Sequence, residues 1–320
     1  MIEDQDVRPK LAISSCLLGQ EVRFDGAHKR DNWLLKQLGE HVDYQPICPE
    51  VGIGLGIPRP PIRLVGTPES YRVVGVKDAS IDVTDRLMEF GFNTSANLQG
   101  IAGYVLKSKS PSCGMERVKL YNEDGRFVGG TATGVHARAV MQALPNLPVE
   151  EEGRLHDPVL RENFVNRIYV YQRWLTLRSE PLTPSALIQF HAQHKYMVMA
   201  HSQAAYQRLG RLLAHLKGVD LIPVADAYEA ELMTALKRRV SRARHVNVLQ
   251  HIQGYLKKKI DGDDKEELAK SIESYRRGEV PLIVPIKLFQ HYFRRNPDSY
   301  IDQQWYLSPY PEKLGLRNSI

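Results

Sequence analysis

The sequence lacks the features that mark membrane-spanning or disulfide-stapled proteins. No apolar run reaches the roughly 18 residues that a membrane-spanning helix needs. The opening residues, MIEDQDVRPK, are acidic and contain no apolar segment, so they do not resemble a secretion signal. The three cysteines are too few and too scattered for a disulfide framework. We therefore expect a cytoplasmic protein, not bound to membranes, with reduced cysteines.

The composition is that of a folded globular protein with a mild excess of positive charge. The 320 residues are 42% hydrophobic and 25% charged, and their formal net charge is +6. A chain of this length is long enough to form two domains. The positive charge permits an anionic partner such as a nucleotide or RNA but does not require one.

Two kinds of pattern divide the chain near residue 150. The first half predicts strands over 10–14, 41–47, 71–76 and 103–106 and helices over 33–40, 80–99 and 134–144. This alternation indicates an α/β domain over residues 1–150 with a mainly parallel, Rossmann-like sheet. Prolines and three consecutive glutamates in 145–155 are typical of a boundary.

The second half has the periodicity of helices. It predicts an all-α domain over residues 151–320, with about five helices and an extended tail. The helical patterns are separated by prolines and cover residues 158–180, 184–217, 226–260, 264–278 and 285–296.

Each cysteine follows a predicted strand. Cys16 and Cys48 come after the first two strands, and Cys113 comes in SKSPSCG after the strand 103–106. The carboxyl ends of parallel strands meet at one edge of a sheet, where ligands bind in open α/β folds. Free cysteines are often merely buried, but this shared placement favours a common three-thiolate site.

Three thiolates limit the metals that such a site suits. A structural zinc site takes four ligands, often from C-x2-C pairs, and the sequence contains no such pair. An iron–sulfur cube normally takes four cysteines, so three would leave one iron open. Soft thiolate ligands suit iron–sulfur chemistry. A 4Fe–4S cluster on Cys16, Cys48 and Cys113 is therefore the leading hypothesis.

Polar residues beside two of the cysteines are candidate catalytic groups. Glu50 lies two residues beyond Cys48, and Ser110 and Ser112 flank Pro111 beside Cys113. A carboxylate beside a cluster can act as a general acid or base, and the hydroxyls can donate hydrogen bonds. The alternative is that these side chains only stabilise turns.

A nucleotide substrate would also need phosphate contacts. Candidates are Arg23, Arg59 and Arg63, which lie close in sequence to the cysteines, and Gly130 and Thr131, which precede the helix 134–144. The alternatives are solvated or structural arginines and a hairpin turn after Gly125.

The helical half holds a stripe of His191, His194 and His201 on one helix face. The stripe could bind a metal or phosphate or lie at an interface, and the alternative is a polar, partly buried stripe. Basic clusters at 238–244 and 257–259 suit RNA or thiolated tRNA contact, or simply solvated helix faces.

Four segments together resemble the thiouracil desulfidase family. They are ISSCLLGQEVRFDG (13–26), PICPEVGIGLGIPRPPIRLV (46–65), KSKSPSCG (107–114) and GVHARAV (134–140). The segment FHAQHKYMVMAHSQAAYQRLG (190–210) is similar to the second domain of YbgA-type two-domain proteins.

The resemblance implies a 4Fe–4S cluster held by Cys16, Cys48 and Cys113. It implies that sulfur is removed as sulfide from thiolated pyrimidines such as thiouracil or thiouridine monophosphate and exchanged for oxygen. It also implies Glu50 and Ser110, with Ser112 as second choice, as catalytic helpers. Two rival functions are a nucleic-acid-binding protein with a structural metal and a scaffold with reduced core thiols.

Overall fold

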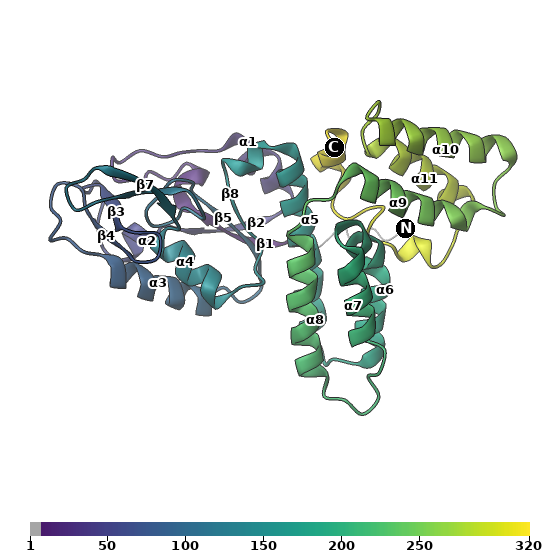
Figure 1. Ribbon diagram of the computed structural model, residues 1–320, viewed down its shortest axis with the longest axis horizontal. Helices are drawn as coiled ribbons and strands as arrows, with labels where there is room; N and C mark the ends of the chain where they lie inside the picture. The colour runs from purple at the N-terminus through teal and green to yellow at the C-terminus, as the bar shows by residue number, and fades with distance from the viewer. Residues whose placement is uncertain (1–7) are drawn as a thin grey trace. The chain divides into compact units, whose positions relative to one another are not determined.

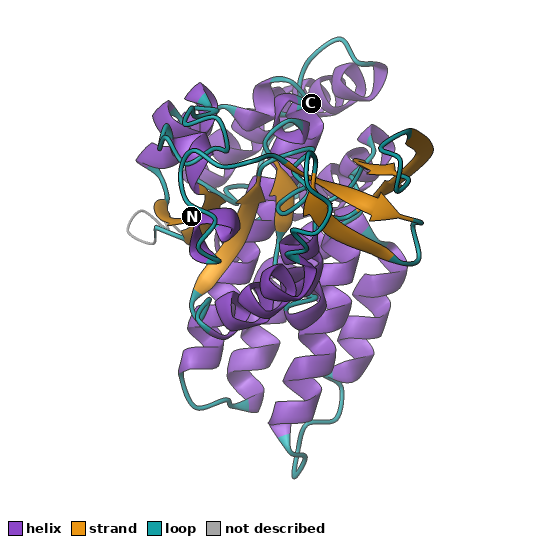
Figure 2. Ribbon diagram, turned by 90° about the vertical axis from the view of Figure 1, so that its left-hand side faces the viewer, coloured by secondary structure: helices purple, strands orange, loops and turns teal. Residues whose placement is uncertain are grey.

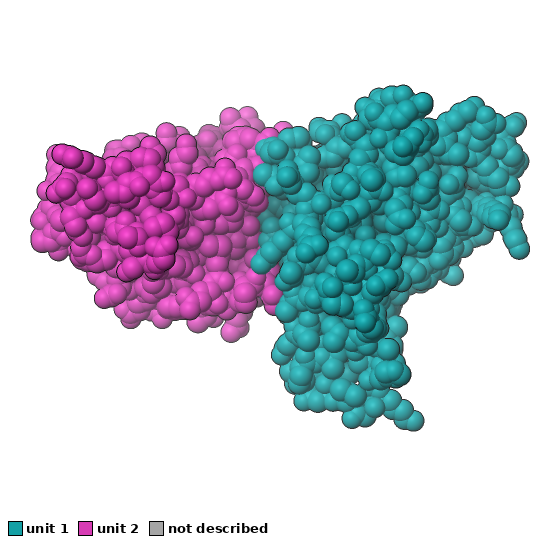
Figure 3. All heavy atoms as spheres, in the orientation of Figure 1, with its two compact units in different colours: residues 1–7, 157–320 teal, residues 8–156 magenta. Residues whose placement is uncertain are grey.

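The structure is a computed structural model that describes residues 8–320 (Figure 1). The first seven residues, where the sequence shows no secretion signal, lie outside the described residues. The described residues form two compact units, 8–156 and 157–320 (Figure 3). All described strands belong to the first unit. Figure 2 draws the strands in orange and the helices in purple. Each unit is described by itself below.

The first unit is built on a four-stranded parallel sheet. Its strand order is β2 (Asp43–Ile47), β1 (Lys10–Ser14), β5 (Ile101–Leu106) and β8 (Val149–Glu151). The two central strands are almost entirely buried because helices and loops cover both faces. The predicted α/β domain with a mainly parallel sheet is confirmed. The short strand β8 extends this unit beyond the expected boundary at residue 150.

Four helices accompany this sheet: α1 (Asn32–Lys36), α2 (Pro49–Gly52), α3 (Thr84–Ala96) and α4 (Val135–Ala143). Helices α3 and α4 lie side by side (Figure 1). A Cβ atom on Gly91 of α3 would lie 2.5 Å from the Cβ of Ala139 on α4. The glycine inside α3 therefore allows the two helices to pack closely.

A second, mixed sheet was only partly predicted. Its order is β4 (Tyr71–Gly75), β3 (Ile62–Gly66), β6 (Val118–Tyr121) and β7 (Phe127–Ala132). Strand β4 lies at an edge, as expected. Strands β6 and β7 form a hairpin that turns at Gly125, whose φ is 81°. Gly130 and Thr131 therefore belong to a strand of this hairpin.

The second unit is all-α, as predicted. Its helices are α5 (Pro158–Ser179), α6 (Pro184–His201), α7 (Gln203–Leu212), α8 (Leu221–Leu236), α9 (Arg242–Gln253), α10 (Gly262–Arg277) and α11 (Ile283–Arg295). Two expected long helices are each divided into two. One break is at Ser202, whose side chain caps α7, and the other lies between α8 and α9.

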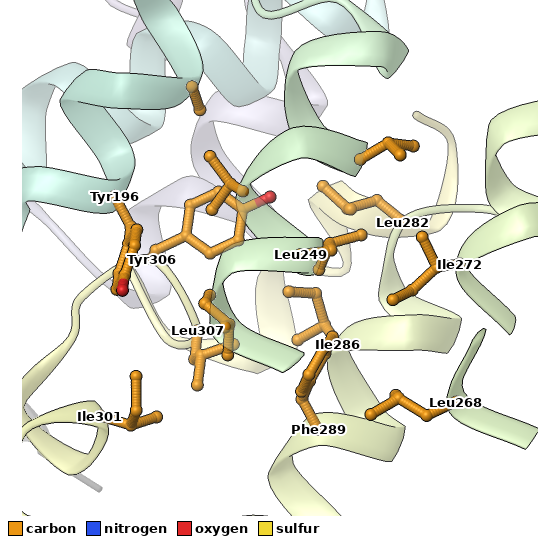
Figure 4. Packing of buried hydrophobic residues seen from close by; sticks show 14 of the residues in the cluster. Tyr196, Leu249, Leu268, Ile272, Leu282, Ile286, Phe289, Ile301, Tyr306 and Leu307 are labelled. Carbon is orange, nitrogen blue, oxygen red and sulfur yellow. The ribbon is translucent and has the colours of Figure 1, made fainter. Parts of the chain in front are cut away.

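The core of the second unit joins helices to the tail. Leu249 of α9 and Ile286 and Phe289 of α11 lie in one buried cluster with Tyr306 (Figure 4). The tail was expected to be extended, but it forms short 3-10 turns in which Leu314 and Leu316 are buried. Burial of these apolar side chains explains the difference. Among residues 8–320, no helix is both long and apolar enough to cross a bilayer.

Candidate active site

A cavity of about 320 Å³ lies at the carboxyl ends of β1 and β2. Its lining includes all three cysteines, Cys16, Cys48 and Cys113, together with Glu50 and Lys107. We call it the thiol cavity. The structure thus brings together three thiols that are far apart in the sequence, at the sheet edge where the parallel topology predicts a site.

Local geometry explains how Cys16 and Cys48 reach the cavity. Cys16 lies in a 3-10 turn directly after β1, and this turn ends at Gly19, whose φ is 89°. Cys48 directly follows β2 and is the N-cap of α2, in which Pro49 takes the first position. Both thiols are therefore placed by the end of a strand.

Cys113 is placed by a loop rather than by a strand end. The Ser110 hydroxyl accepts hydrogen bonds from the backbone N–H groups of Ser112 and Cys113, at 3.2 and 3.1 Å. A Cβ atom on Gly134 would lie 2.6 Å from the Ser112 carbonyl carbon. Glycine at this position therefore lets the start of α4 pack directly against the cysteine loop.

The three thiols influence one another electrostatically. Burial raises the pKa of Cys16 to about 11, opposed by the positive charges of Lys107 and Arg23. Burial also raises the pKa of Cys48 and of Cys113, and the Cys113 pKa is raised further by Glu50 and by the two other thiols. Without a metal, all three groups are therefore neutral thiols at neutral pH.

Both carboxylate oxygens of Glu50 are held by hydrogen bonds. Ser112 Oγ donates to Oε1 at 2.9 Å, and Arg59 Nε donates to Oε2 at 2.8 Å. Arg59 Nη1 and Nη2 also donate to the carbonyl oxygens of Gly56 and Val22. The Arg59 side chain is only 3% exposed. The structure therefore uses Arg59 to position Glu50, and its donors are engaged by the chain itself.

The remaining predicted residues divide into two groups. Ser110 and Arg23 line the thiol cavity, and Ser112 lies buried behind Glu50. Arg63, Gly130 and Thr131 are not part of the lining.

Arg63 and the start of α4, both expected to contact a phosphate, have other roles. The Arg63 guanidinium lies over the ring of Tyr121. The N–H groups of Val135 and Ala137 at the start of α4 donate to the carbonyl oxygens of Pro111 and Ser112. This helix end therefore holds the cysteine loop in place of a phosphate.

Lys107 and Glu152 were not predicted. Lys107 lines the cavity, and its ammonium donates to Ser108 Oγ at 2.9 Å and forms an ion pair with Glu152. Lys107 directly follows β5. Its position at the carboxyl end of a parallel strand, which made Cys16 a candidate, could therefore have predicted Lys107 as well. Glu152 directly follows β8 in the acidic run that resembled a linker.

The three histidines of the predicted stripe have structural partners. His194 Nδ1 donates to the Phe190 carbonyl oxygen at 2.8 Å, and His201 Nδ1 donates to the Arg238 carbonyl oxygen at 2.5 Å. His191 Nδ1 lies 3.1 Å from the Tyr228 hydroxyl. Burial lowers the pKa of His194 to about 3 and of His201 to about 4. These contacts fit a buried polar stripe of neutral imidazoles.

Comparisons with known proteins divide the chain in the same way as its structure. Residues 11–152 match the 2-thiouracil desulfurase family, and residues 195–311 match a family described as a protein of unknown function (DUF1722).

Two curated proteins are similar to about half of the chain each. One is the uncharacterized protein YbgA of Escherichia coli (strain K12), which is 34% identical over 154 residues, 48% of this chain and 91% of YbgA. The other is the uncharacterized protein YbbK of Bacillus subtilis (strain 168), 31% identical over 153 residues, 46% of this chain and 98% of YbbK.

A solved structure, that of the [4Fe-4S]-dependent thiouracil desulfidase TudS, is 34% identical to the chain. The match covers 48% of this chain and 98% of that protein, with a TM-score of 0.37. Through the family matches and the curated relatives together, the chain belongs to the 2-thiouracil desulfurase family over residues 11–152 and joins this segment to one of the DUF1722 family.

Proposed function

We propose that this chain removes sulfur from a thiolated pyrimidine by exchanging it for oxygen. The observation that carries the proposal is the thiol cavity, where Cys16, Cys48 and Cys113 meet the fixed carboxylate of Glu50. The cavity lies within the segment that matches the 2-thiouracil desulfurase family. The rest of the proposal follows from the chemistry of these side chains.

The three thiols fit an iron–sulfur cluster better than a single ion. Among the residues that the structure describes, no three His, Cys, Asp or Glu side chains are grouped closely enough to hold one metal ion. A single tetrahedral zinc would bring its sulfur ligands within roughly 4 Å of one another. A cluster of several irons is held by cysteine thiolates that lie farther apart. Cys16, Cys48 and Cys113 would hold such a cluster.

The net reaction needs no external electrons. One water and one thiocarbonyl give one carbonyl and one hydrogen sulfide, so a carbon–oxygen bond replaces a carbon–sulfur bond. When bound, a cluster with one iron free of protein ligands would supply a Lewis acid with affinity for sulfur.

Glu50 is the group that would handle the proton of the attacking water. Its carboxylate lines the cavity, and Arg59 and Ser112 fix its orientation from behind. A carboxylate held in one orientation acts on a water more effectively than a mobile one. Ser110, whose hydroxyl also organises the Cys113 loop, lines the same cavity and can hydrogen-bond the substrate or the water.

The remaining lining favours a flat, anionic substrate. Phe24, Ile47 and Ile62 supply apolar surface against which a pyrimidine ring can lie. Arg23 and Lys29 add positive charge to the same cavity. We therefore propose a thiolated pyrimidine nucleotide, such as thiouridine monophosphate, in preference to the free base.

Sulfide release by anaerobically reconstituted protein tests this proposal. We expect sulfide from thiouridine monophosphate and, less efficiently, from thiouracil. The variant Glu50→Gln should keep its iron and lose at least about 100-fold in turnover, the usual scale for removing a general base. Glu123→Gln is the matched control, because Glu123 also pairs with an arginine, Arg72, but is exposed and lines no part of the cavity.

Three results would contradict the proposal. Fully loaded protein that releases no sulfide from any thiolated pyrimidine would exclude the activity. One bound zinc without sulfide release would favour a nucleic-acid-binding protein with a structural metal. Unchanged turnover in Glu50→Gln would remove Glu50 from the reaction.

A further inference from the structure

The helical unit holds a second cavity, of about 490 Å³, to which no function is assigned. It lies where α6 ends and α7 begins, next to the connection between α8 and α9 and the first turns of α9. We call it the arginine cavity. Arg238 and Arg244 supply its charge, and Gln203, Asn247 and His251 supply further polar groups.

The charge of the arginine cavity has one sign. Both of its arginines are exposed, and its described lining contains no carboxylate. The segment 237–244 carries five lysine or arginine residues and no acidic one. The guanidinium of Arg238 makes no hydrogen bond or ion pair with the residues that the structure describes. Such a cavity attracts an anion.

A buried histidine fixes the two arginine positions relative to each other. His201 Nδ1 donates to the Arg238 carbonyl oxygen at 2.5 Å. The His201 carbonyl oxygen accepts from Arg244 Nη1 at 2.7 Å. His201 is only 1% exposed. One buried residue thus holds the main chain at Arg238 and the guanidinium of Arg244, which leaves the Arg238 guanidinium free to contact a ligand.

The first residues of α7 add to this attraction. Gln203 and Ala204 line the cavity and begin a ten-residue helix. The Ser202 hydroxyl accepts from the Ala205 N–H, so the cap leaves the first two amides of the helix without that partner. Helix amides favour an anion, and here they supplement two guanidinium groups.

The chemistry of the lining points to a phosphate group. Guanidinium groups match the geometry of phosphate oxygens and bind them through paired hydrogen bonds. The volume suits a small molecule. A single-stranded nucleic acid would also need aromatic rings on which its bases stack, and the described lining offers only the imidazole of His251.

We propose that the arginine cavity binds the phosphate group of a small phosphate-bearing molecule. Arg238 and Arg244 are the main ligands, and the nucleobase or sugar that carries the phosphate is not recognised. This site is independent of the thiol cavity and of the reaction proposed there.

Isothermal titration of the full chain with inorganic phosphate, ribose 5-phosphate, uridine monophosphate and uridine tests the proposal. We expect the three phosphate-bearing probes to bind with similar affinity and uridine not to bind. Loss of one charge-assisted contact, in Arg238→Ala, should weaken phosphate binding about tenfold or more. Arg239→Ala removes the same charge from the neighbouring exposed residue outside the lining and should change the affinity less than about twofold.

A folding check on Arg238→Ala and two further variants make the result interpretable. Arg238→Ala retains the main-chain carbonyl that His201 binds, and circular dichroism should confirm that it folds. Asn247→Asp adds a carboxylate to the exposed lining and should also weaken binding. Arg23→Ala removes a positive charge from the thiol cavity and should leave phosphate binding at the arginine cavity intact, which separates the two sites.

Four outcomes would overturn the proposal. These are the absence of saturable phosphate binding at millimolar concentrations, equal losses in Arg238→Ala and Arg239→Ala, uridine binding as tightly as uridine monophosphate, and a short single-stranded RNA that binds much more tightly than any of the small probes.

Discussion

At the scale of single residues, Arg59 shows how a side chain takes a role that its sequence position does not reveal. It lies in a proline-rich loop nine residues from Glu50, a separation that fits no helical or strand period. From the sequence, Arg59 was therefore predicted to be a phosphate ligand. In the structure it is buried, and its donors reach Glu50, Gly56 and Val22.

This arrangement predicts the effect of Arg59→Lys. Lysine keeps the charge but cannot reproduce the planar set of donors. The turnover number should fall at least about tenfold, because Glu50 loses its orientation, and the KM for thiouridine monophosphate should change less than about twofold. Steady-state sulfide release, with iron content measured in parallel, provides the check. A raised KM with unchanged turnover would instead assign Arg59 to the substrate phosphate.

At the scale of secondary-structure elements, the contact between the Cys113 loop and the start of α4 is too close to accept a side chain at residue 134. Gly134 lies against the main chain of Ser112 and Cys113, and the first amides of α4 hold the loop carbonyls. Any side chain at residue 134 must move the loop that carries Cys113. The third thiol therefore depends on a helix that contributes no side chain of its own to the cavity.

We predict that Gly134→Ala displaces Cys113 while the unit stays folded. Overpacking of this kind costs about 1–3 kcal/mol of folding free energy. The iron content after anaerobic reconstitution should fall clearly below that of the unchanged chain. Gly130→Ala is the control, because a Cβ there would meet only side-chain atoms: Leu120 Cδ1 of β6 at 3.3 Å and Pro68 Cγ, between β3 and β4, at 3.4 Å. Normal iron content in Gly134→Ala would contradict this account of the loop.

The sequence predicts β1, β2 and β5 of the parallel sheet well because helices lie between them and because the two central strands, β1 and β5, are buried apolar runs. It predicts the second sheet and the edge strand β8 of the parallel sheet poorly. Strand β7 is largely exposed and contains two glycines, and β8 lies in an acidic run. Glu150 and Glu151 are nevertheless buried, because Glu150 pairs with Arg154 and Glu151 accepts from the Met115 N–H. Met115 lies 36 residues from Glu151, and the Glu150–Arg154 pair depends on a 3-10 turn directly after β8, so the local pattern does not reveal these partners.

At the scale of the whole molecule, both units bury neutral histidines: the first unit buries His136, whose pKa burial lowers to about 4, and the second unit buries more of them. The second unit buries several histidines as neutral imidazoles, among them His194 and His201. Because burial lowers their pKa below the ordinary value of 6.5, the unfolded chain binds more protons than the folded one. The stability that depends on these histidines is therefore present above pH 6.5 and is lost as the pH falls toward 4 and 3.

We predict that the helical unit loses stability between about pH 7 and pH 5, by about 1.4 kcal/mol per pH unit for each such histidine below its unfolded pKa. Urea unfolding measured by tryptophan fluorescence provides the check. The variant Trp33→Phe leaves Trp174 and Trp305, which are both buried in the helical unit. An unfolding free energy that does not change over this range would show that the histidines are not buried as neutral groups.

The central claim concerns the three thiols acting as one site, and the iron bound per chain tests it most directly. Anaerobically reconstituted protein should hold about four irons per chain. Each of the variants Cys16→Ala, Cys48→Ala and Cys113→Ala should lose that iron, since each removes one of only three ligands. Full iron content in any one of these variants, or no iron in the unchanged chain, would contradict the claim.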